Sequence, residues 1–206
     1  MNHHNNEIHP VFHEILQRED KEKFLNQRSK VIWLTGLSGS GKTTIAKNLE
    51  RELYNKGYLS QVLDGDNIRT GINNNLTFTV ADRWENIRRI AEVSKLLINS
   101  GIITINSFIS PTEEIRQIAI DVIGRTNFFE IYVNAPLEVC EKRDTKGLYK
   151  KVRRGEIKDF TGISSPFEVP VGADLEIRTD LLTVEESVAN CMELILPTVK
   201  YDKHDA

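Results

Sequence analysis

The sequence predicts a single α/β domain with a mostly parallel central sheet and helices on both faces. Three observations support this fold class. Short apolar runs typical of buried strands alternate with longer amphipathic segments typical of helices. The first of these runs leads directly into a glycine-rich turn, as in a strand–helix–strand unit. The chain has 206 residues, of which 39% are hydrophobic and 28% are charged, and this composition suits one domain with its own core.

The first elements are expected around one buried strand, the unbroken apolar run from Val31 to Leu34. Before it, apolar residues recur at roughly helical spacing from Pro10 to about Asn26, which predicts an amphipathic helix packed on the domain or on a partner subunit. After it, a helix should run from about Lys42 to Lys56 and stop at Gly57. A strand from Gln61 to Asp64 follows.

The middle of the chain is predicted to hold the longest helix. A polar stretch with a run of asparagines, Gly65 to Thr77, separates this helix from the second strand. The helix should start at Thr79, because Asp82 follows at capping distance, and should run to Gly101. The next strand is expected from Ile102 to Phe108.

Ser110 is expected to cap the following helix, because Pro111 and Glu113 occupy the positions typical of a helix start. Phe128 to Val133 predicts a further buried strand. Two short helical segments should surround Lys146-Gly147. These features extend the alternation of strands and helices through the second half of the chain.

The last third of the chain should contain a loop or lid, Phe160 to Ala173, because this stretch is rich in glycine and proline. A final strand, Leu175 to Arg178, and a final helix opened by Thr183 and Glu186 follow. The expected organisation has four parts: an N-terminal extension with the amphipathic helix (1–28), the α/β domain (29–200), a basic lid within it (about 142–173) and a polar tail (201–206).

The composition excludes several classes of protein. The formal net charge of -3 gives no electrostatic reason to expect nucleic acid as a partner. No apolar run reaches the roughly 18 residues of a membrane helix, and the polar start, Met1 to Asn6, lacks the apolar core of a signal peptide. Cys140 and Cys191 are too few for a disulfide framework, so reduced, buried thiols and a cytoplasmic location are expected.

The histidines lie only near the two ends of the chain: His3, His4, His9, His13 and His204. Their absence from the body of the domain excludes a Ser-His-Asp triad, a histidine general base and most zinc sites there. His9 and His13 have the i, i+4 spacing of a metal-binding pair, but solvated terminal histidines are the favoured interpretation.

The segment from Gly36 to Thr43 matches the phosphate-binding pattern G-x-x-x-x-G-K-[ST] at every fixed position, and it lies between a strand and a helix. Its glycines let backbone N–H groups point inward and surround phosphates together with the positive end of the helix. Lys42 should reach the β- and γ-phosphates, and the Thr43 hydroxyl should bind Mg²⁺. The sequence therefore predicts a nucleoside-triphosphate site, which could serve a switch, a motor or a transferase.

A second set of polar residues is expected beside this loop, because the carboxyl ends of parallel strands share one edge of a sheet. Asp64 and Asp66 could orient Mg²⁺-bound water and accept a proton from an attacking hydroxyl, and Arg69 adds a bidentate anion donor. Arg83 and Asn86 lie one turn apart on the long helix and can both face the cleft. These residues favour phosphoryl transfer to a small molecule.

Two features of the second half of the chain add to this interpretation. The cations gathered between Lys142 and Lys158 favour a mobile lid that neutralises transferring phosphates over a nucleic-acid patch. Phe160, just beyond them on a glycine-containing loop, could pack on a flat group such as a base. Ser110 could line the same cleft while it caps its helix.

In combination these segments resemble adenylylsulfate kinase (APS kinase), a family of P-loop nucleotide kinases. The resemblance covers about residues 10 to 195 and rests on seven blocks in family order: GLSGSGKTT at 36–44, DGDNIR at 64–69, DRxENIRR at 82–89, FISP at 108–111, PLEVCExRD at 136–144, KGLY at 146–149 and FTGI at 160–163. It implies ATP-dependent phosphorylation of the ribose 3′-hydroxyl of adenosine 5′-phosphosulfate (APS) to give 3′-phosphoadenosine 5′-phosphosulfate (PAPS). No sulfurylase segment accompanies these blocks, which predicts the stand-alone enzyme.

The resemblance also implies roles on the ATP side. Lys42 and Asp64 would be catalytic, with Asp64 as the candidate general base. Thr43 would hold Mg²⁺, with Asp64 or Asp66 acting through water. The residues that would bind ATP are Gly36, Leu37, Ser38, Gly39, Ser40, Gly41, Lys42, Thr43, Thr44 and Arg143. The family is usually a homodimer, and the N-terminal helix is one candidate contact.

On the APS side, Arg69, Arg83 and Asn86 would hold the phosphosulfate and ribose, and Phe78 and Phe160 would stack on the two faces of the adenine. The remaining residues of this group would be Asp66, Ser110 and Lys146. Of these, Lys146 would close over the phosphates, and Asp66 would support the geometry of the metal and the acceptor. Ser110 falls on the customary active-site serine of the family. A covalent phosphoserine is not expected there, because in-line transfer between two bound nucleotides needs no intermediate.

The chain departs from the family pattern in two places. Thr112 to Arg116 lacks the usual aromatic and basic pair, and Phe167 stands where Tyr is more usual, within a segment altered from Pro166 to Asp174. Both departures bear on acceptor affinity. Two other hypotheses remain: a P-loop kinase of a different nucleotide-like acceptor, and an ATP-binding switch without transferase activity.

Overall fold

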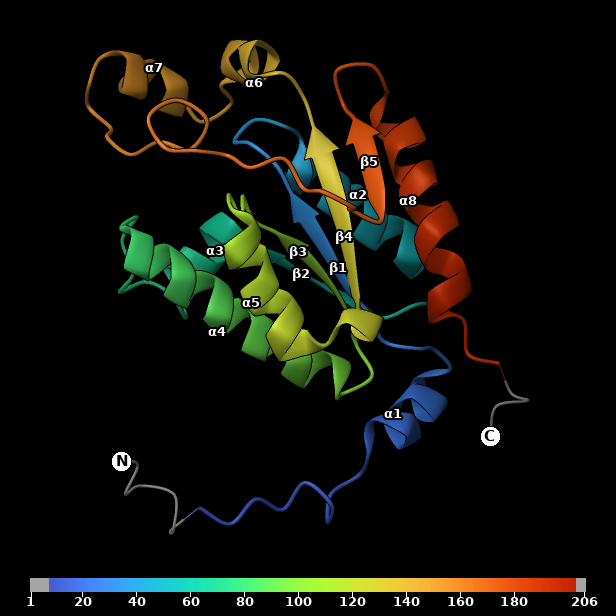
Figure 1. Cartoon of the computed structure of the whole chain (residues 1–206). Coiled ribbons are helices and arrows are strands. Elements are labelled where there is room, and N and C mark those ends of the chain that lie inside the picture. Colours follow the sequence, from blue (N-terminus) through green and yellow to red (C-terminus); the bar gives the residue numbers. More distant parts are fainter. Residues whose placement is uncertain (1–7, 203–206) are drawn as a thin grey trace.

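The computed structural model describes residues 8–202 and contains a five-stranded sheet with the order β2-β3-β1-β4-β5 (Figure 1). All four strand pairs are parallel, as the fold class predicted. Each strand begins and ends within one residue of its predicted position. The strands are β1 (Val31–Thr35), β2 (Ser60–Asp64), β3 (Ile103–Ser107), β4 (Phe128–Asn134) and β5 (Leu175–Arg178).

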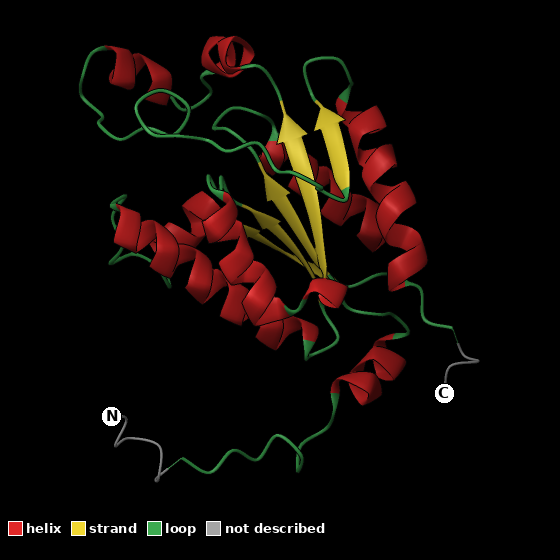
Figure 2. Cartoon of the chain, in the orientation of Figure 1, coloured by secondary structure: helices red, strands yellow, loops and turns green. Residues whose placement is uncertain are grey.

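Helices cover both faces of this sheet (Figure 2). One face packs against α2 and α8, and the other packs against α4 and α5. The short α6 and α7 lie beyond the carboxyl ends of the strands, where Figure 1 shows them above the arrowheads. The helices are α1 (Arg18–Leu25), α2 (Lys42–Asn55), α3 (Gly65–Thr70), α4 (Val80–Ile98), α5 (Glu113–Ile123), α6 (Leu137–Arg143), α7 (Leu148–Arg153) and α8 (Val184–Val199).

The central strand β1 explains why the apolar run in the sequence is unbroken. Every residue of β1 is fully buried, because side chains alternate between two covered faces. Ile32 and Leu34 join the core under α2 and α8, whereas Val31 and Trp33 join the core under α4 and α5. The loop that follows β1 is thereby fixed at the carboxyl edge of the sheet.

Several helix ends follow the predicted signals. The Thr79 side chain caps α4 by accepting a hydrogen bond from the N–H of Asp82 at 3.2 Å. Thr183 and Glu186 form a reciprocal capping box at the start of α8. Gly57 follows α2 in the left-handed region with φ of 85°.

Ser110 does not cap α5, contrary to the prediction. The cap is Thr112, whose side chain accepts a hydrogen bond from the N–H of Ile115 at 3.4 Å. A capping residue has an extended backbone, and Ser110 instead has φ of 44°. Pro111 therefore lies before the helix and not at its first position.

The N-terminal helix is shorter than predicted, because α1 begins only at Arg18. The apolar residues expected to pack from the preceding segment are exposed in the single chain: Val11, Phe12, Ile15 and Leu16. A buried carboxylate attaches α1 to the domain instead, since Glu22 accepts hydrogen bonds from the backbone N–H and the hydroxyl of Ser29 at 2.8 and 2.6 Å. The short helix α3 was missed, because it lies in a stretch with few apolar residues.

Four expectations concern the ends and the composition of the chain. Met1 to Asn6, with His3 and His4, and His204 with most of the polar tail lie outside the described residues. Within residues 8–202, Cys140 and Cys191 are buried free thiols. In the same part of the chain, no group of three or more His, Cys, Asp or Glu residues is placed to hold a metal ion. None of the helices described there is long and apolar enough to span a bilayer.

Candidate active site

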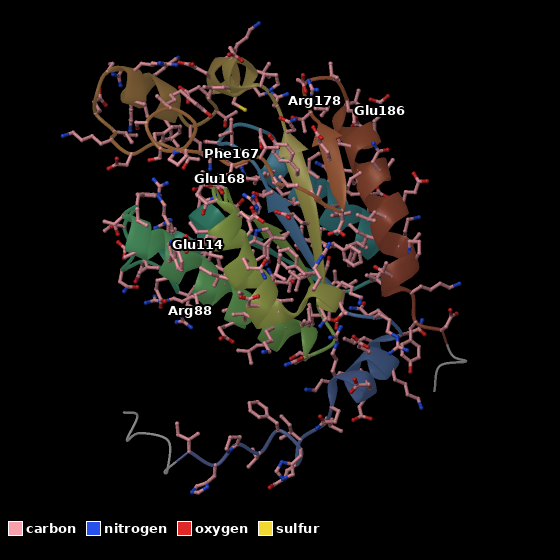
Figure 3. All side chains as sticks on the ribbon, viewed as in Figure 1. Arg88, Glu114, Phe167, Glu168, Arg178 and Glu186 are labelled. Carbon is pink, nitrogen blue, oxygen red and sulfur yellow. The ribbon has the colours of Figure 1, made fainter. Side chains whose placement is uncertain are left out.

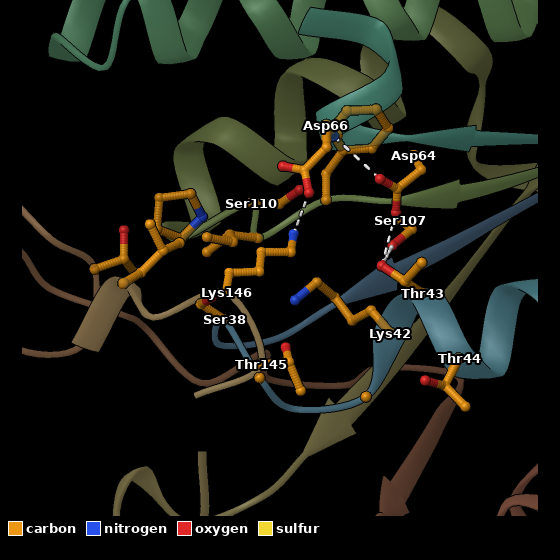
Figure 4. A pocket seen from close by; sticks show the side chains of 18 of the residues that line it. Ser38, Lys42, Thr43, Thr44, Asp64, Asp66, Ser107, Ser110, Thr145 and Lys146 are labelled. Carbon is orange, nitrogen blue, oxygen red and sulfur yellow. Dashed lines mark hydrogen bonds and ion pairs between the residues drawn. The ribbon is translucent and has the colours of Figure 1, made fainter. Parts of the chain in front are cut away.

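One cavity of about 780 Å³ lies at the carboxyl edge of the sheet. Its walls come from the loop after β1, the β2–α3 junction, the start of α4, the loop after β3 and the lid segment between α6 and β5. Figure 4 shows that Lys42 and Thr43 approach this space from one segment while Asp66, Ser110 and Lys146 approach it from three others. Segments far apart in the sequence therefore share one site.

The loop after β1 has the geometry of a phosphate cradle. The ammonium of Lys42 is buried and donates hydrogen bonds to the backbone carbonyls of Gly36 and Leu37 at 2.9 and 2.8 Å. Burial lowers the pKa of Lys42 from 10.5 to about 8. A side chain at Gly36 would meet the carbonyl oxygen of Val133 at 2.3 Å, so only glycine allows β1 and β4 to hold the loop this closely.

Oxygen donors gather beside the cradle. The Thr43 hydroxyl donates to Asp64 Oδ2 at 2.7 Å and lies 3.5 Å from the Ser107 hydroxyl (Figure 4). The other oxygen of Asp64 accepts a hydrogen bond from the N–H of Asp66 at 3.1 Å and so caps α3. Hydroxyl and carboxylate oxygens are the ligands that Mg²⁺ prefers, so this cluster fits a magnesium ion.

Two arginines line the part of the cavity formed by α3 and α4. The Arg69 guanidinium stacks 4.2 Å from the centre of the Phe78 ring and donates to the carbonyls of Leu76 and Thr77, each at 3.0 Å. Burial lowers the pKa of Arg69 from its ordinary value. The Phe78 ring is 66% exposed, so one of its faces is held by Arg69 and much of it is open to a ligand.

The second arginine joins α4 to the lid. Arg83 donates to the Phe78 carbonyl at 2.9 Å, to the Thr161 hydroxyl at 3.0 Å and to the Asp159 carbonyl. Asn86, one turn further along α4, is buried at the cavity wall. The prediction that Arg83 and Asn86 share the face of α4 toward the cleft is confirmed.

The lid contributes charged and aromatic groups. Lys146 pairs with Asp66 across the cavity (Figure 4). Phe160 packs edge-on against Tyr149 with 5.0 Å between the ring centres, and the Tyr149 hydroxyl donates to the carbonyl of Ser38 in the cradle at 2.9 Å. Burial raises the pKa of Tyr149, so its hydroxyl stays a hydrogen-bond donor.

Arg143 holds the end of α6 against the cradle. Its guanidinium donates to the carbonyl of Gly39 at 3.2 Å and to the carbonyl of Thr179 at 2.7 Å. The Thr179 hydroxyl in turn donates to the carbonyl of Ser40 at 2.6 Å. The loop after β5 and the cradle are thus fastened to the same arginine.

Ser110 belongs to the floor of the cavity. Its hydroxyl oxygen accepts a hydrogen bond from the indole N–H of the buried Trp33 at 2.9 Å. Its backbone carbonyl accepts a hydrogen bond from Arg116 at 3.1 Å. Trp33 stacks between Phe108 and Phe128, so this serine rests on a rigid aromatic layer.

The two segments that depart from the family pattern contact each other. Phe167 and Glu168 lie where the lid returns across the start of α5 (Figure 3). The Glu168 carboxylate accepts a hydrogen bond from the N–H of Glu113 at 2.7 Å, and its carbonyl accepts one from Arg116 at 3.0 Å. Phe167 stacks on Tyr132 with ring centres 6.0 Å apart. The two segments therefore share one set of contacts.

The cavity brings together most of the predicted site residues. Those that line it are Ser38, Gly39, Gly41, Lys42, Thr43, Thr44, Asp64, Asp66, Arg69, Phe78, Arg83, Asn86, Ser110, Arg143, Lys146 and Phe160. Gly36, Leu37 and Ser40 lie behind this wall, where the first two orient Lys42 through their carbonyls.

Arg88 and Arg89 both pair with Glu85 at 2.7 Å instead of lining the cavity. Figure 3 shows Arg88 on the side of α4 away from the lid. Sequence reasoning missed Ser107, although a hydroxyl at the end of a buried strand next to Asp64 was a usable signal. It also missed Thr161, which lies within the FTGI block at 160–163, and Thr179, which carried no signal.

A parallel sheet that presents a phosphate cradle, oxygen ligands and a second anion-binding wall to one cavity defines a kinase of the P-loop class. A family model described as adenylylsulphate kinase matches residues 28–178. The chain belongs to the adenylylsulphate kinase family.

Two relatives and one solved structure show the extent of the similarity. The chain is 60% identical to an adenylyl-sulfate kinase of Bacteroides fragilis over 195 residues, which cover 95% of this chain and 96% of the relative. It is 54% identical to that of Clostridium kluyveri over 181 residues, covering 88% and 90%. An APS kinase from Mycobacterium tuberculosis, solved in complex with AMPPNP and APS, superposes with a TM-score of 0.79 at 44% identity, covering 82% of this chain and 98% of that one.

Proposed function

We propose that this chain transfers the γ-phosphoryl group of ATP to the ribose 3′-hydroxyl of APS, which gives PAPS and ADP. The observation that carries the proposal is that the phosphate cradle and the anion-binding wall around Arg69 and Arg83 line the same cavity. A nucleotide-dependent switch would need only the phosphate cradle and not the anion-binding wall. The mycobacterial structure with an ATP analogue and APS supports the same pair of substrates here.

The donor nucleotide would lie on the cradle. Backbone N–H groups between Gly36 and Thr44 would surround its phosphates, and the α2 dipole would add positive potential. Lys42 would exchange its two carbonyl partners for the β- and γ-phosphate oxygens. Arg143 already touches the cradle and would lie against the donor nucleotide.

The acceptor would lie against α3, α4 and the lid. Arg69, Arg83 and Asn86 would hold the phosphosulfate and the ribose, while Phe78 and Phe160 would stack on the adenine. Asp66, Lys146 and Ser110 would complete the wall, with Lys146 closing over the phosphates. The exposed ring of Phe78 suits this role, because a base can cover it without displacing a packed side chain.

Asp64 would act as general base. The 3′-oxygen of APS would form a bond to the γ-phosphorus while the bond from that phosphorus to the bridging oxygen breaks, and ADP would leave with the electron pair. The proton of the 3′-hydroxyl would pass to the carboxylate of Asp64. Thr43 would hold Mg²⁺, with Asp64 or Asp66 acting through water, and the ion would neutralise phosphate charge when it is bound there.

Steady-state assays with purified protein test this function. ATP, Mg²⁺ and APS should give ADP and PAPS in equal amounts, and equal concentrations of other nucleotides should react much more slowly. Turnover of another nucleotide without APS turnover would assign the chain to a different acceptor. Tight ATP binding without acceptor-dependent ADP release would assign it to a switch.

The chain is also proposed to act as a homodimer in the cytoplasm. The exposed apolar residues Val11, Phe12, Ile15 and Leu16 suit a contact between subunits, and the two buried free thiols suit a reducing compartment. Light scattering on a sizing column should give twice the chain mass of 23.5 kDa. Phe12→Glu should shift the protein toward monomer, and an unchanged dimer would place the contact elsewhere.

A further inference from the structure

The asparagine run between α3 and α4 has no place in the site described so far. Asn73 is fully buried, whereas Asn74 and Asn75 are exposed. A buried amide is costly unless its polar atoms are hydrogen-bonded. The Asn73 side chain meets this condition on two sides. Its Nδ2 donates to Asn86 Oδ1 at 2.9 Å and to the backbone carbonyl of Asn86 at 3.5 Å, and its Oδ1 accepts from Arg89 Nη1 at 3.4 Å.

These hydrogen bonds fix the direction of both amides. A guanidinium can only donate, so Asn73 must turn its oxygen toward Arg89 and its NH₂ group toward Asn86. Asn86 must then turn its own oxygen toward Asn73. The NH₂ group of Asn86 makes no hydrogen bond within residues 8–202, and Asn86 lines the cavity, so this NH₂ group is left for a ligand.

The guanidinium that sets this direction is itself held in place. Arg89 Nε donates to Glu85 at 2.7 Å, and its Nη1 donates to the carbonyl of Ile72 at 3.1 Å and to Asn75 Oδ1 at 2.9 Å. Arg89 therefore cannot turn away without losing several partners. The hydrogen-bonded chain from Arg89 through Asn73 to Asn86 therefore runs from the surface of α4 to the cavity wall.

We propose that Asn73 is a positioning residue that makes Asn86 offer a hydrogen-bond donor, and not an acceptor, to the second substrate. A donor at this point selects a group with a lone pair, such as an oxygen of the phosphosulfate or of the ribose. The inference rests on the proposed function, since it concerns how APS is bound. It gives the orientation of the Asn86 side chain a cause outside the cavity.

Asn73→Asp tests the direction of the amides, because it changes shape very little. The carboxylate still accepts from Arg89 but cannot donate to Asn86, so the Asn86 amide turns over and presents its oxygen to APS. The KM for APS should rise about tenfold or more, as expected for a lost hydrogen bond to a charged group. The KM for ATP and kcat at saturating APS should change little, whereas the Tm should fall, because the buried carboxylate faces the backbone carbonyl of Asn86.

Asn75→Asp is the matched control. It adds the same charge to the same guanidinium, but Asn75 is exposed and makes no hydrogen bond to Asn86. Its KM for APS should stay within about twofold of the original value. If the two substitutions raised the KM for APS equally, the added charge alone would explain the effect and the inference would be overturned. An unchanged KM for APS in Asn73→Asp would also overturn it.

A double-mutant cycle tests whether Asn73 acts through Asn86. In an Asn86→Ala background, Asn73→Asp should raise the KM for APS no further, and a full additional effect would overturn the inference. If Asn73→Asp does not fold, Arg89→Met keeps both amides and removes the guanidinium, one of the two groups outside the amide pair that direct them. It should raise the KM for APS about threefold, and an unchanged KM would overturn the inference.

Lack of APS turnover by the unmodified chain would instead reject the proposed function and this inference together.

Discussion

The two halves of the cavity are built in different ways. The half proposed to face ATP comes from consecutive residues, Gly36 to Thr44, and its key group, Lys42, is only 8% exposed and is held by backbone carbonyls. The half proposed to face APS is assembled from side chains on α3, α4 and the lid, and its Phe78 is 66% exposed. Local sequence thus determines one half, and contacts between distant segments determine the other.

This difference separates phosphate chemistry from acceptor selection. The cradle depends on glycines at positions where a side chain would collide with backbone, as at Gly36. The acceptor half depends on hydrogen bonds such as those from Arg83 to the lid and from Asn73 to Asn86. Substitutions in the first half should stop transfer, whereas substitutions in the second should mostly change the KM for APS.

The largest effect is expected for Lys42→Ala in the ATP half. Loss of the charge that stabilises the transferring phosphate should lower kcat/KM by about a thousandfold or more. ADP release in the presence of APS measures it, and circular dichroism checks the fold. Near-normal turnover by the folded variant would remove Lys42 from the chemistry.

Asp64→Asn is expected to be next, at the border of the two halves. Loss of the general base should lower kcat about a hundredfold, whereas the Kd for ATP should change less than about threefold. Rapid-quench measurement of the transfer step, together with ATP titration, separates the two quantities. The reverse pattern would limit Asp64 to nucleotide binding.

Phe78→Ala probes the APS half. Loss of base stacking should raise the KM for APS about tenfold and leave the KM for ATP unchanged. Because Phe78 is exposed and Phe160 packs on Tyr149, only Phe160→Ala should also lower the Tm. A rise in the KM for ATP with Phe78→Ala would instead assign the ring to the half that binds ATP.

The pKa of Lys42 predicts how ATP binding depends on pH. With its pKa lowered to about 8, the free protein loses the ammonium charge as pH rises through that value, whereas bound phosphates favour the charged form. The affinity for ATP should therefore fall about tenfold between pH 7 and pH 9. Calorimetric titration measures this fall, and Lys42→Arg, which stays charged, should show no such dependence.

The smallest effect is expected for Ser110→Ala. Because Ser110 does not cap α5, this substitution removes no helix cap. It would instead leave the buried indole N–H of Trp33 without its hydrogen-bond acceptor. Stability to denaturant should fall by about 1 kcal/mol, and substantial activity should remain. Complete inactivation of a folded variant would assign Ser110 a direct role in phosphoryl transfer.

Sequence reasoning reached the fold because the central strand β1 is buried on both faces, so its apolar run is unbroken and marks the middle of the sheet. It failed at Ser110 because the left-handed backbone at that residue, which the sequence does not show, leaves the capping of α5 to Thr112. It extended α1 too far, because Ile15 and Leu16 continue the apolar spacing without being buried.

The same limits apply to the site. The cradle was readable from eight residues, and most of the residues proposed to bind the acceptor came from the family blocks. The partners that hold them were not, since no sequence pattern joins Asn73 to Asn86 or Arg83 to Thr161. The first pair needs the loop after α3 to fold onto α4, and the second needs α4 to meet the lid.

The indole beneath Ser110 also gives the protein an optical reporter. Trp33 is fully shielded from solvent, and the chain has two tryptophans in all. A shielded indole emits at shorter wavelength than a solvated one, and its emission depends on the partner of its N–H. Replacement of Trp84 by Phe would leave Trp33 as the single fluorophore, so that ligand arrival at the floor of the site could be followed in a stopped-flow instrument without any label.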